Sequence, residues 1–179
     1  MECTGGAKVA LLPRIRIKPW PAGARDDGGT ERVMRVEMNT FLVALDASPR
    51  APMVLDAAIA LARPLGAKLV LYRSVSIPPE IPLGLYLGSS GSLEGLLVDN
   101  AEKDIEELAK KVPPELLAAK LVEIATPWDG ICRVADAQKA DLVVIGSHGY
   151  GGLDRLLGTT AAKVVNHTHC SVYVVRPAQ

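Results

Sequence analysis

Leu142-Val143-Val144-Ile145-Gly146-Ser147-His148-Gly149-Tyr150-Gly151-Gly152 is the stretch of sequence that decides the fold. It begins with a short, β-branched run that suits a strand buried on both faces. A loop with four glycines follows, and Gly158-Thr159-Thr160 then opens a helical stretch. Glycines let backbone N–H groups approach a ligand closely, and the N-terminus of a helix attracts anions. This order of strand, glycine-rich loop and helix predicts a site for a nucleotide or another phosphorylated ligand.

Strands and helices alternate from residue 39 onward. Buried, β-branched runs predict strands over 41–45, 69–75, 121–125, 142–145 and 171–175. Apolar residues at helical spacing lie between them over 54–61, 97–112, 131–135 and 161–166. The alternation predicts an α/β fold with a single doubly wound, five-stranded parallel sheet in the order 3-2-1-4-5 and helices on both faces. Ligands of such sheets bind beyond the carboxyl strand ends, where the strand order reverses, so Asp46 and Gly146 are expected to wall the site.

Several residues signal where helices begin and end. Ser48 followed by Pro49 predicts a helix N-cap, and Gly66 predicts the end of that helix. Pro52 fits if the helix begins one or two residues later. Residues 126–129 have the spacing of a capping box and predict the start of the third helix.

Two segments differ in composition from the rest. Residues 1–38 contain three prolines, several glycines and scattered arginines without a sustained period, which predicts a disordered N-terminal extension before a folded domain over 39–179. The alternative for this extension is a basic interaction arm. Residues 77–92 are rich in Pro, Gly and Ser and predict a long loop that serves as a lid or binding segment, or is mobile.

Composition argues against several classes of partner. Lys plus Arg and Asp plus Glu are 20 each, and this neutral balance disfavours general nucleic-acid binding. Apolar stretches fall short of the roughly 20 residues that span a bilayer, so we expect no membrane partner. Cys3, Cys132 and Cys170 are odd in number and lie outside C-x-x-C spacing. They therefore argue against disulfides and zinc, and they predict a cytoplasmic protein.

Known phosphate-binding motifs fit only in part. The turn after the first strand is Asp46-Ala47-Ser48, which is neither Gly-x-Gly-x-x-Gly nor a P-loop. Val43-Ala44-Leu45-Asp46-Ala47-Ser48 and the stretch from Ala140 to Thr160 instead closely resemble the opening and closing signatures of the universal stress protein family. The likeness covers residues 39–177.

The resemblance implies a site for ATP or a related adenine nucleotide, with Mg²⁺. It implies that Asp46 meets the ribose or adenine side, although a helix-cap or turn role for Asp46 stays open. The backbone around Ala44 and Ser74 would frame adenine. The phosphates would be lined by Gly146, His148, Gly149, Gly158, Thr159 and Thr160. Part of the family has Gly-x2-Gly-x9-Gly-Ser/Thr here, and the loop between Gly149 and Gly158 is one residue shorter. Thr159 and Thr160 would also serve as helix N-caps without a ligand.

Function follows from the same resemblance. It implies a stress-response sensor or regulator, and a homodimer through Val172–Val175 of a final strand that should lie at a sheet edge. Hydrolysis should be slow at most, because we find no dedicated base and no arginine–lysine clamp. A nucleotide-free dimeric interaction module, with the shortened loop collapsed, is the alternative. An ATP pyrophosphatase ranks last, because its phosphate loop after the first strand is missing.

Histidines offer two further hypotheses. His148 could be catalytic, but the sequence shows no positioned nucleophile and acid beside it. His167, His169 and Cys170 could form a metal cluster. A histidine at a helix C-terminus is also favoured by the helix dipole, and we prefer that interpretation. We therefore predict no catalytic residue and no metal ligand.

Overall fold

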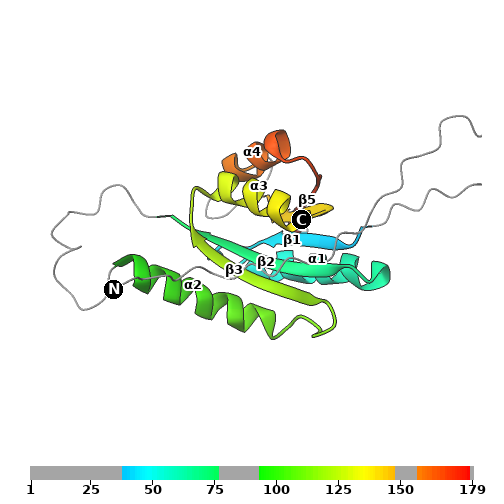
Figure 1. Cartoon of the computed structure of the whole chain (residues 1–179), viewed down its shortest axis with the longest axis horizontal. Coiled ribbons are helices and arrows are strands. Elements are labelled where there is room, and N and C mark those ends of the chain that lie inside the picture. The colour runs from blue at the N-terminus through cyan, green and yellow to red at the C-terminus, as the bar shows by residue number, and fades with distance from the viewer. Residues whose placement is uncertain (1–37, 77–92, 148–156, 178–179) are drawn as a thin grey trace, which may run out of the picture. The chain divides into compact units, whose positions relative to one another are not determined.

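The computed structural model describes residues 38–76, 93–147 and 157–177. Residues 1–37, the predicted 77–92 loop, His148 and Gly149 lie outside the described residues, so the predictions for them stay predictions. The described elements are β1 (Thr40–Ala44), α1 (Ala51–Leu65), β2 (Lys68–Val75), α2 (Leu93–Ala109), β3 (Leu117–Ile124), α3 (Pro127–Gln138), β4 (Leu142–Gly146), α4 (Thr159–His167) and β5 (Ser171–Val175). All strand pairs are parallel, in the order β3-β2-β1-β4-β5, which confirms the predicted fold class (Figure 1).

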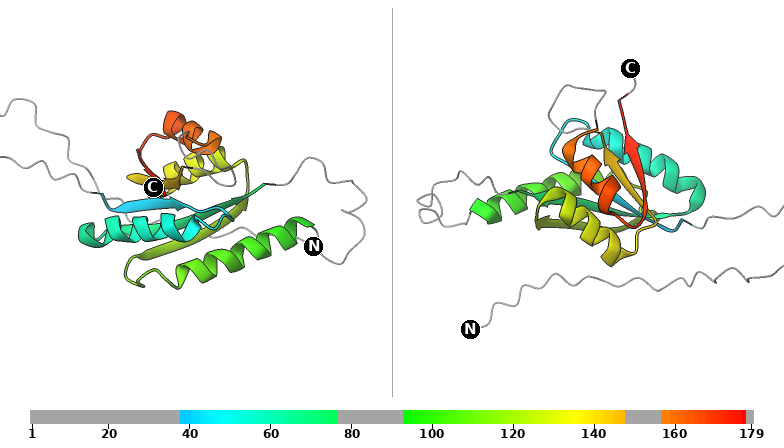
Figure 2. Two further views of the ribbon diagram at one scale, coloured as in Figure 1. Left: turned by 180° about the vertical axis from the view of Figure 1, so that it is seen from behind. Right: turned by 90° about the horizontal axis from the view of Figure 1, so that it is seen from above.

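The helices form two layers, one on each face of the sheet. Helices α1 and α2 cover one face, and α3 and α4 cover the other, as the two views of Figure 2 show. The central strand β1 contributes to both cores, because successive side chains of a strand point to opposite faces. Phe41 and Val43 pack toward α1, whereas Leu42 and Ala44 pack toward α3 and α4. This burial on both faces explains why the strand reads as a continuous apolar run.

Helix α1 begins later than Ser48 and Pro49 predict. Arg50 is the residue before the helix, and Pro52 lies in its first turn, where its missing N–H costs nothing. The hydroxyl of Ser48 instead accepts a hydrogen bond from the Arg50 N–H at 3.3 Å, one turn ahead of the helix. Gly66 ends the helix as predicted, with a left-handed φ of 66°.

Strand β3 begins four residues earlier than predicted. It pairs with β2 from Leu117 onward, and the register shifts between Leu69 and Val70. The alanines at 118 and 119 carry little strand signal, so pairing with β2 decides this boundary. The predicted start of α3 is confirmed, since Thr126 is the residue before the helix and Pro127 its first, but the Thr126 side chain makes no cap hydrogen bond.

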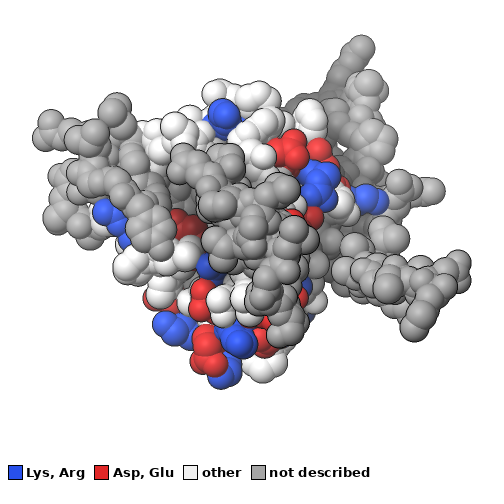
Figure 3. Space-filling view, turned by 90° about the vertical axis from the view of Figure 1, so that its left-hand side faces the viewer, with Lys and Arg blue, Asp and Glu red and all other residues white. Residues whose placement is uncertain are grey.

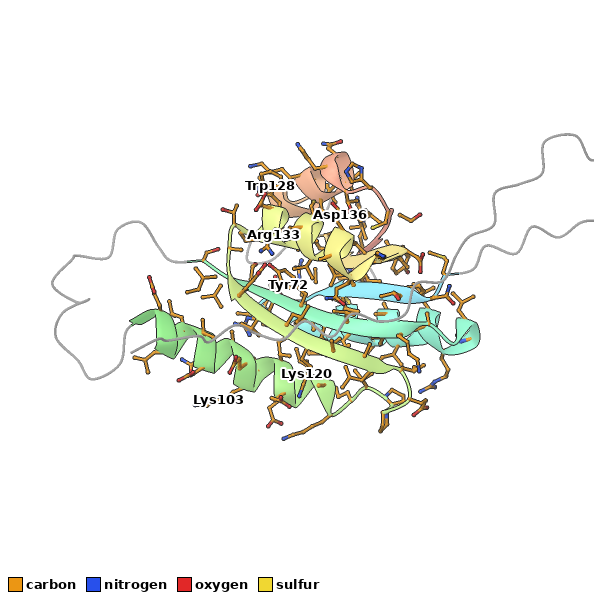
Figure 4. The ribbon with its side chains drawn as sticks, viewed as in Figure 1. Tyr72, Lys103, Lys120, Trp128, Arg133 and Asp136 are labelled. Atoms are coloured by element: carbon orange, nitrogen blue, oxygen red, sulfur yellow. The ribbon has the colours of Figure 1, made fainter. Side chains whose placement is uncertain are left out.

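A polar cluster joins α3 to the sheet. The hydroxyl of Tyr72 donates to Glu123 Oε1 at 2.8 Å, and the Arg133 guanidinium bonds the same carboxylate. Figure 4 shows Arg133 on α3 beside Tyr72 of β2. Burial and the bond to Glu123 raise the pKa of Tyr72 well above its ordinary value. Burial alone would raise the pKa of Glu123, but the hydrogen bonds from Arg133 and Tyr72 outweigh it and lower that pKa. Glu123 is therefore ionised and paired at neutral pH.

Gly130 is the position where α3 lies against this cluster. A Cβ there would overlap the Tyr72 hydroxyl and meet Ala125 Cβ at 3.1 Å. We expect Gly130→Ala to lower the free energy of unfolding by about 1–3 kcal/mol, the usual cost of overpacking. Urea denaturation would measure this loss. Tyr72→Phe in the same chain should reduce the loss, and an equal loss in both backgrounds would show that the overlap is not its cause.

Glu123 should make the stability depend on acid pH. Because its pKa is lowered in the folded state, the ionised carboxylate stabilises the fold above the unfolded-state pKa, and this contribution is lost as the pH falls through the folded-state pKa. Glu123→Gln should therefore cost about 1–2 kcal/mol near neutral pH and progressively less as the pH falls into the acid range. Denaturation curves of both proteins across this range would measure the difference. A constant difference at every pH would contradict the prediction.

Candidate functional site

A cavity of about 700 Å³ lies at the carboxyl ends of the central strands. Residues that end β1, β2 and β4 form its floor, and α1, α2, α3 and α4 contribute its walls. The chain leaves β1 toward β2, whereas β4 lies on the opposite side of β1. The cavity therefore occupies the point where strand order reverses, the ordinary ligand position in an open α/β sheet.

Seven of the nine predicted site residues line this cavity. They come from three strand ends and one helix start, and they are Ala44, Asp46, Ser74, Gly146, Gly158, Thr159 and Thr160. His148 and Gly149, the other two, lie outside the described residues. The fold thus brings together residues that are more than 100 positions apart in the chain.

Asp46 has the turn role that the sequence left open. Its Oδ1 accepts hydrogen bonds from the backbone N–H of Ser48 at 3.0 Å and from the Ser48 hydroxyl at 2.6 Å. Asp46 is nevertheless exposed and lines the cavity, whereas Ser48 is buried. A carboxylate has about four acceptor sites, so the turn leaves Asp46 able to accept from a ligand hydroxyl.

The start of α4 is held at the end of β4 by the backbone. The Gly158 N–H donates to the Ser147 carbonyl at 2.7 Å, and the Ser147 N–H donates to the Val175 carbonyl at 2.9 Å. Gly158 is the residue before the helix, so Thr159 and Thr160 are its first residues and not its N-caps. N–H groups of a first helical turn have no partner within the helix. They therefore offer donors to an anion at the cavity wall.

Two other helices begin at the same cavity. Arg50 precedes α1 and Pro127 begins α3, and both line it. This convergence is a consequence of the parallel sheet, because each crossover helix starts near the carboxyl end of the strand before it. The partial positive charges of these helix ends add up and favour an anionic ligand.

The wall nearest α2 contains residues that sequence reasoning missed. Arg73 lies near the end of β2, its side chain is 13% exposed, and it pairs through Nη1 with Asp104 Oδ2 of α2 at 2.5 Å. Leu97 and Asn100 of α2 also line the cavity. Leu97, Asn100 and Asp104 lie three and four residues apart and share one helix face. The helical spacing of these three residues is visible in the sequence. Only the position of α2 beside β2 in the structure brings their shared face to the cavity.

Positive and negative side chains lie interspersed on the face seen in Figure 3. No group of three or more His, Cys, Asp or Glu side chains in the described ranges could hold a metal ion. The His167 ring instead donates from Nδ1 to the Lys163 carbonyl at 2.7 Å and packs on Trp128, 5.0 Å between ring centres. None of the described helices has the length and apolar character that crossing a membrane requires.

Comparisons with known proteins agree with this fold. The sequence model of the Universal stress protein family matches residues 38–176. A universal stress protein of Thermus aquaticus is 32% identical over 145 residues, which cover 76% of this chain and 98% of that protein. The solved universal stress protein of Archaeoglobus fulgidus in complex with dAMP has a TM-score of 0.55 at 22% identity, over 78% of this chain and 99% of that one. A further solved structure, of a universal stress protein in complex with cAMP, has a TM-score of 0.53 at 21% identity. The match covers 79% of this chain and 99% of that one.

Proposed function

This chain belongs to the universal stress protein family, and we propose that it binds ATP or a related adenine nucleotide and acts as a stress-response sensor or regulator. The observation that carries the proposal is the cavity at the strand switch point, lined by seven residues that the resemblance assigned to a nucleotide. Two structural neighbours, in complex with dAMP and with cAMP, support an adenine nucleotide in this fold.

The proposed orientation follows from the charges around the cavity. The phosphates would lie at α4, where Thr159 and Thr160 bring the backbone N–H groups of the first helical turn to the wall. The ribose would lie over β1, where the Asp46 carboxylate can accept from its hydroxyls. The base would then lie over the end of β2, beside the backbone of Ser74.

Magnesium would enter with the nucleotide. Phosphate oxygens and water are ligands that Mg²⁺ prefers, so the phosphates at α4 would hold the ion. Bound Mg²⁺ would neutralise phosphate charge. The chain itself offers little for hydrolysis, because the described lining contains neither His nor Lys and Asp46 accepts from Ser48. A general base must lie beside the attacking water, so we propose hydrolysis that is slow at most.

We further propose a homodimer formed through β5, and a cytoplasmic location as the cysteines predict. Strand β5 lies at one edge of the sheet, where its backbone groups can pair with a second copy. Tyr173 of this strand is 42% exposed, and Val165 of the adjoining α4 is exposed as well. These apolar side chains would be covered in the dimer.

Calorimetric titration with ATP, after removal of co-purified nucleotide and with Mg²⁺ present, tests the binding proposal. We expect micromolar or tighter binding, and about tenfold weaker binding by Asp46→Ala because a charged acceptor for the ribose is lost. Asp56→Ala is the matched control, because Asp56 is an exposed carboxylate of α1 outside the cavity. Absence of binding by the unaltered protein would favour the nucleotide-free dimeric module instead.

Sedimentation equilibrium tests the dimer. Tyr173→Lys should shift the protein toward monomer, because a charge at the proposed interface would lose its water on pairing. Ile124→Lys is the matched control, since Ile124 is 44% exposed and ends β3 at the opposite sheet edge. A monomer at micromolar concentration without either change would refute the dimer.

A further inference from the structure

The cavity has a second end, away from α4, where the proposed function places the base but assigns no side chain to it. Strands in a sheet lie about 4.8 Å apart, so the ends of β4 and β2 are separated by about 10 Å. Helix α2 packs against β2 and β3, beyond that span. A nucleotide with its phosphates at α4 and its ribose at β1 therefore directs its base toward β2 and α2.

The side chains at this end suit a flat base with a polar edge. Met53 of α1 and Leu97 of α2 are half-buried apolar side chains that can cover the faces of a ring. Asn100 follows Leu97 by three residues and lines the same wall. It is the one carboxamide among the described lining residues, and within the described ranges no hydrogen bond is assigned to its side chain.

Arg73 is engaged elsewhere at this end. Its guanidinium is bound to Asp104 at 2.5 Å, and the side chain is 13% exposed. Asp104 lies four residues after Asn100, on the same face of α2. The ion pair holds the arginine against the helix, so the neutral side chains at this end are the Asn100 carboxamide and the hydroxyls of Ser74 and Ser76, and of these only the carboxamide places an acceptor beside a separate donor.

We propose that Asn100 contacts the N6 and N7 atoms of the base and makes the cavity prefer adenine over guanine; this inference rests on the proposed nucleotide function. A carboxamide has one acceptor oxygen beside one donor nitrogen. It can accept from the adenine N6 amine and donate to N7 at the same time. Guanine has two acceptors, O6 and N7, at the same places, so the carboxamide can satisfy one of them only. An arginine would bind guanine better, because it can donate to both O6 and N7, but Arg73 is paired with Asp104.

Calorimetry on the full chain with ATP, GTP and 7-deaza-ATP tests this assignment. The last probe replaces N7 by a C–H group and leaves the rest of the nucleotide intact. We expect the unaltered protein to bind ATP about tenfold more tightly than either other nucleotide. In Asn100→Ala, both ratios should fall below about threefold, because the group that distinguishes them is gone.

Asp99→Ala is the matched control, because Asp99 neighbours Asn100 on α2 but lies in the groove toward β3 and not in the cavity. Asp99→Ala should leave the preference for ATP over GTP and over 7-deaza-ATP as it is in the unaltered protein. Alanine is a better helix former than asparagine, so the exposed Asn100→Ala should keep its fold, and thermal unfolding checks this. Ratios that stay unchanged in Asn100→Ala, or equal binding of ATP and GTP by the unaltered protein, would overturn the inference and leave the proposed function standing. Failure of the unaltered protein to bind any of the three would overturn both.

Discussion

Burial of β1 and β4 between two helical layers is the constraint on which the rest of the structure depends. Phe41, Leu42 and Val43 of β1 are fully buried, as are Val143 and Val144 of β4. Such strands need cover on both faces, and parallel pairing with crossover helices provides it. The first two crossovers cover one face and the last two cover the other, so α1 and α2 lie on one side and α3 and α4 on the other (Figure 1). Every strand then ends at the same edge of the sheet.

The site is a consequence of that shared edge. Helices α1, α3 and α4 all begin where the strands before them end, and their N-termini therefore face one cavity. Backbone groups supply the attraction for an anion, which does not require particular side chains. The bonds from Gly158 to Ser147 and from Ser147 to Val175 fix the start of α4 by backbone alone. Side chains are then free to differ at the other end of the cavity, where a base would be distinguished.

The α3 wall is held by a different means. Tyr72, Glu123 and Arg133 connect β2, β3 and α3 through one carboxylate, and Pro127 and Ile131 of the same helix line the cavity. A carboxylate that accepts from two partners and is partly buried fixes the geometry more than an exposed ion pair does. The close approach of Gly130 to Tyr72 shows how near α3 lies to the sheet. The shape of the cavity thus depends on a cluster that does not line it.

The sequence by itself determined the fold class and the strand order, because buried strands have local signals, and the resemblance of its two signatures to the family named seven described residues of the cavity. It did not show Arg50 as the residue before α1, the early start of β3, or Arg73 and Asn100 at the cavity. Pairing with β2 decided the start of β3, since its alanines favour no structure strongly. Arg73 and Asn100 come to the same cavity only when α2 packs beside the end of β2. Contacts between elements far apart in the chain are set by packing in three dimensions, and no local pattern encodes them.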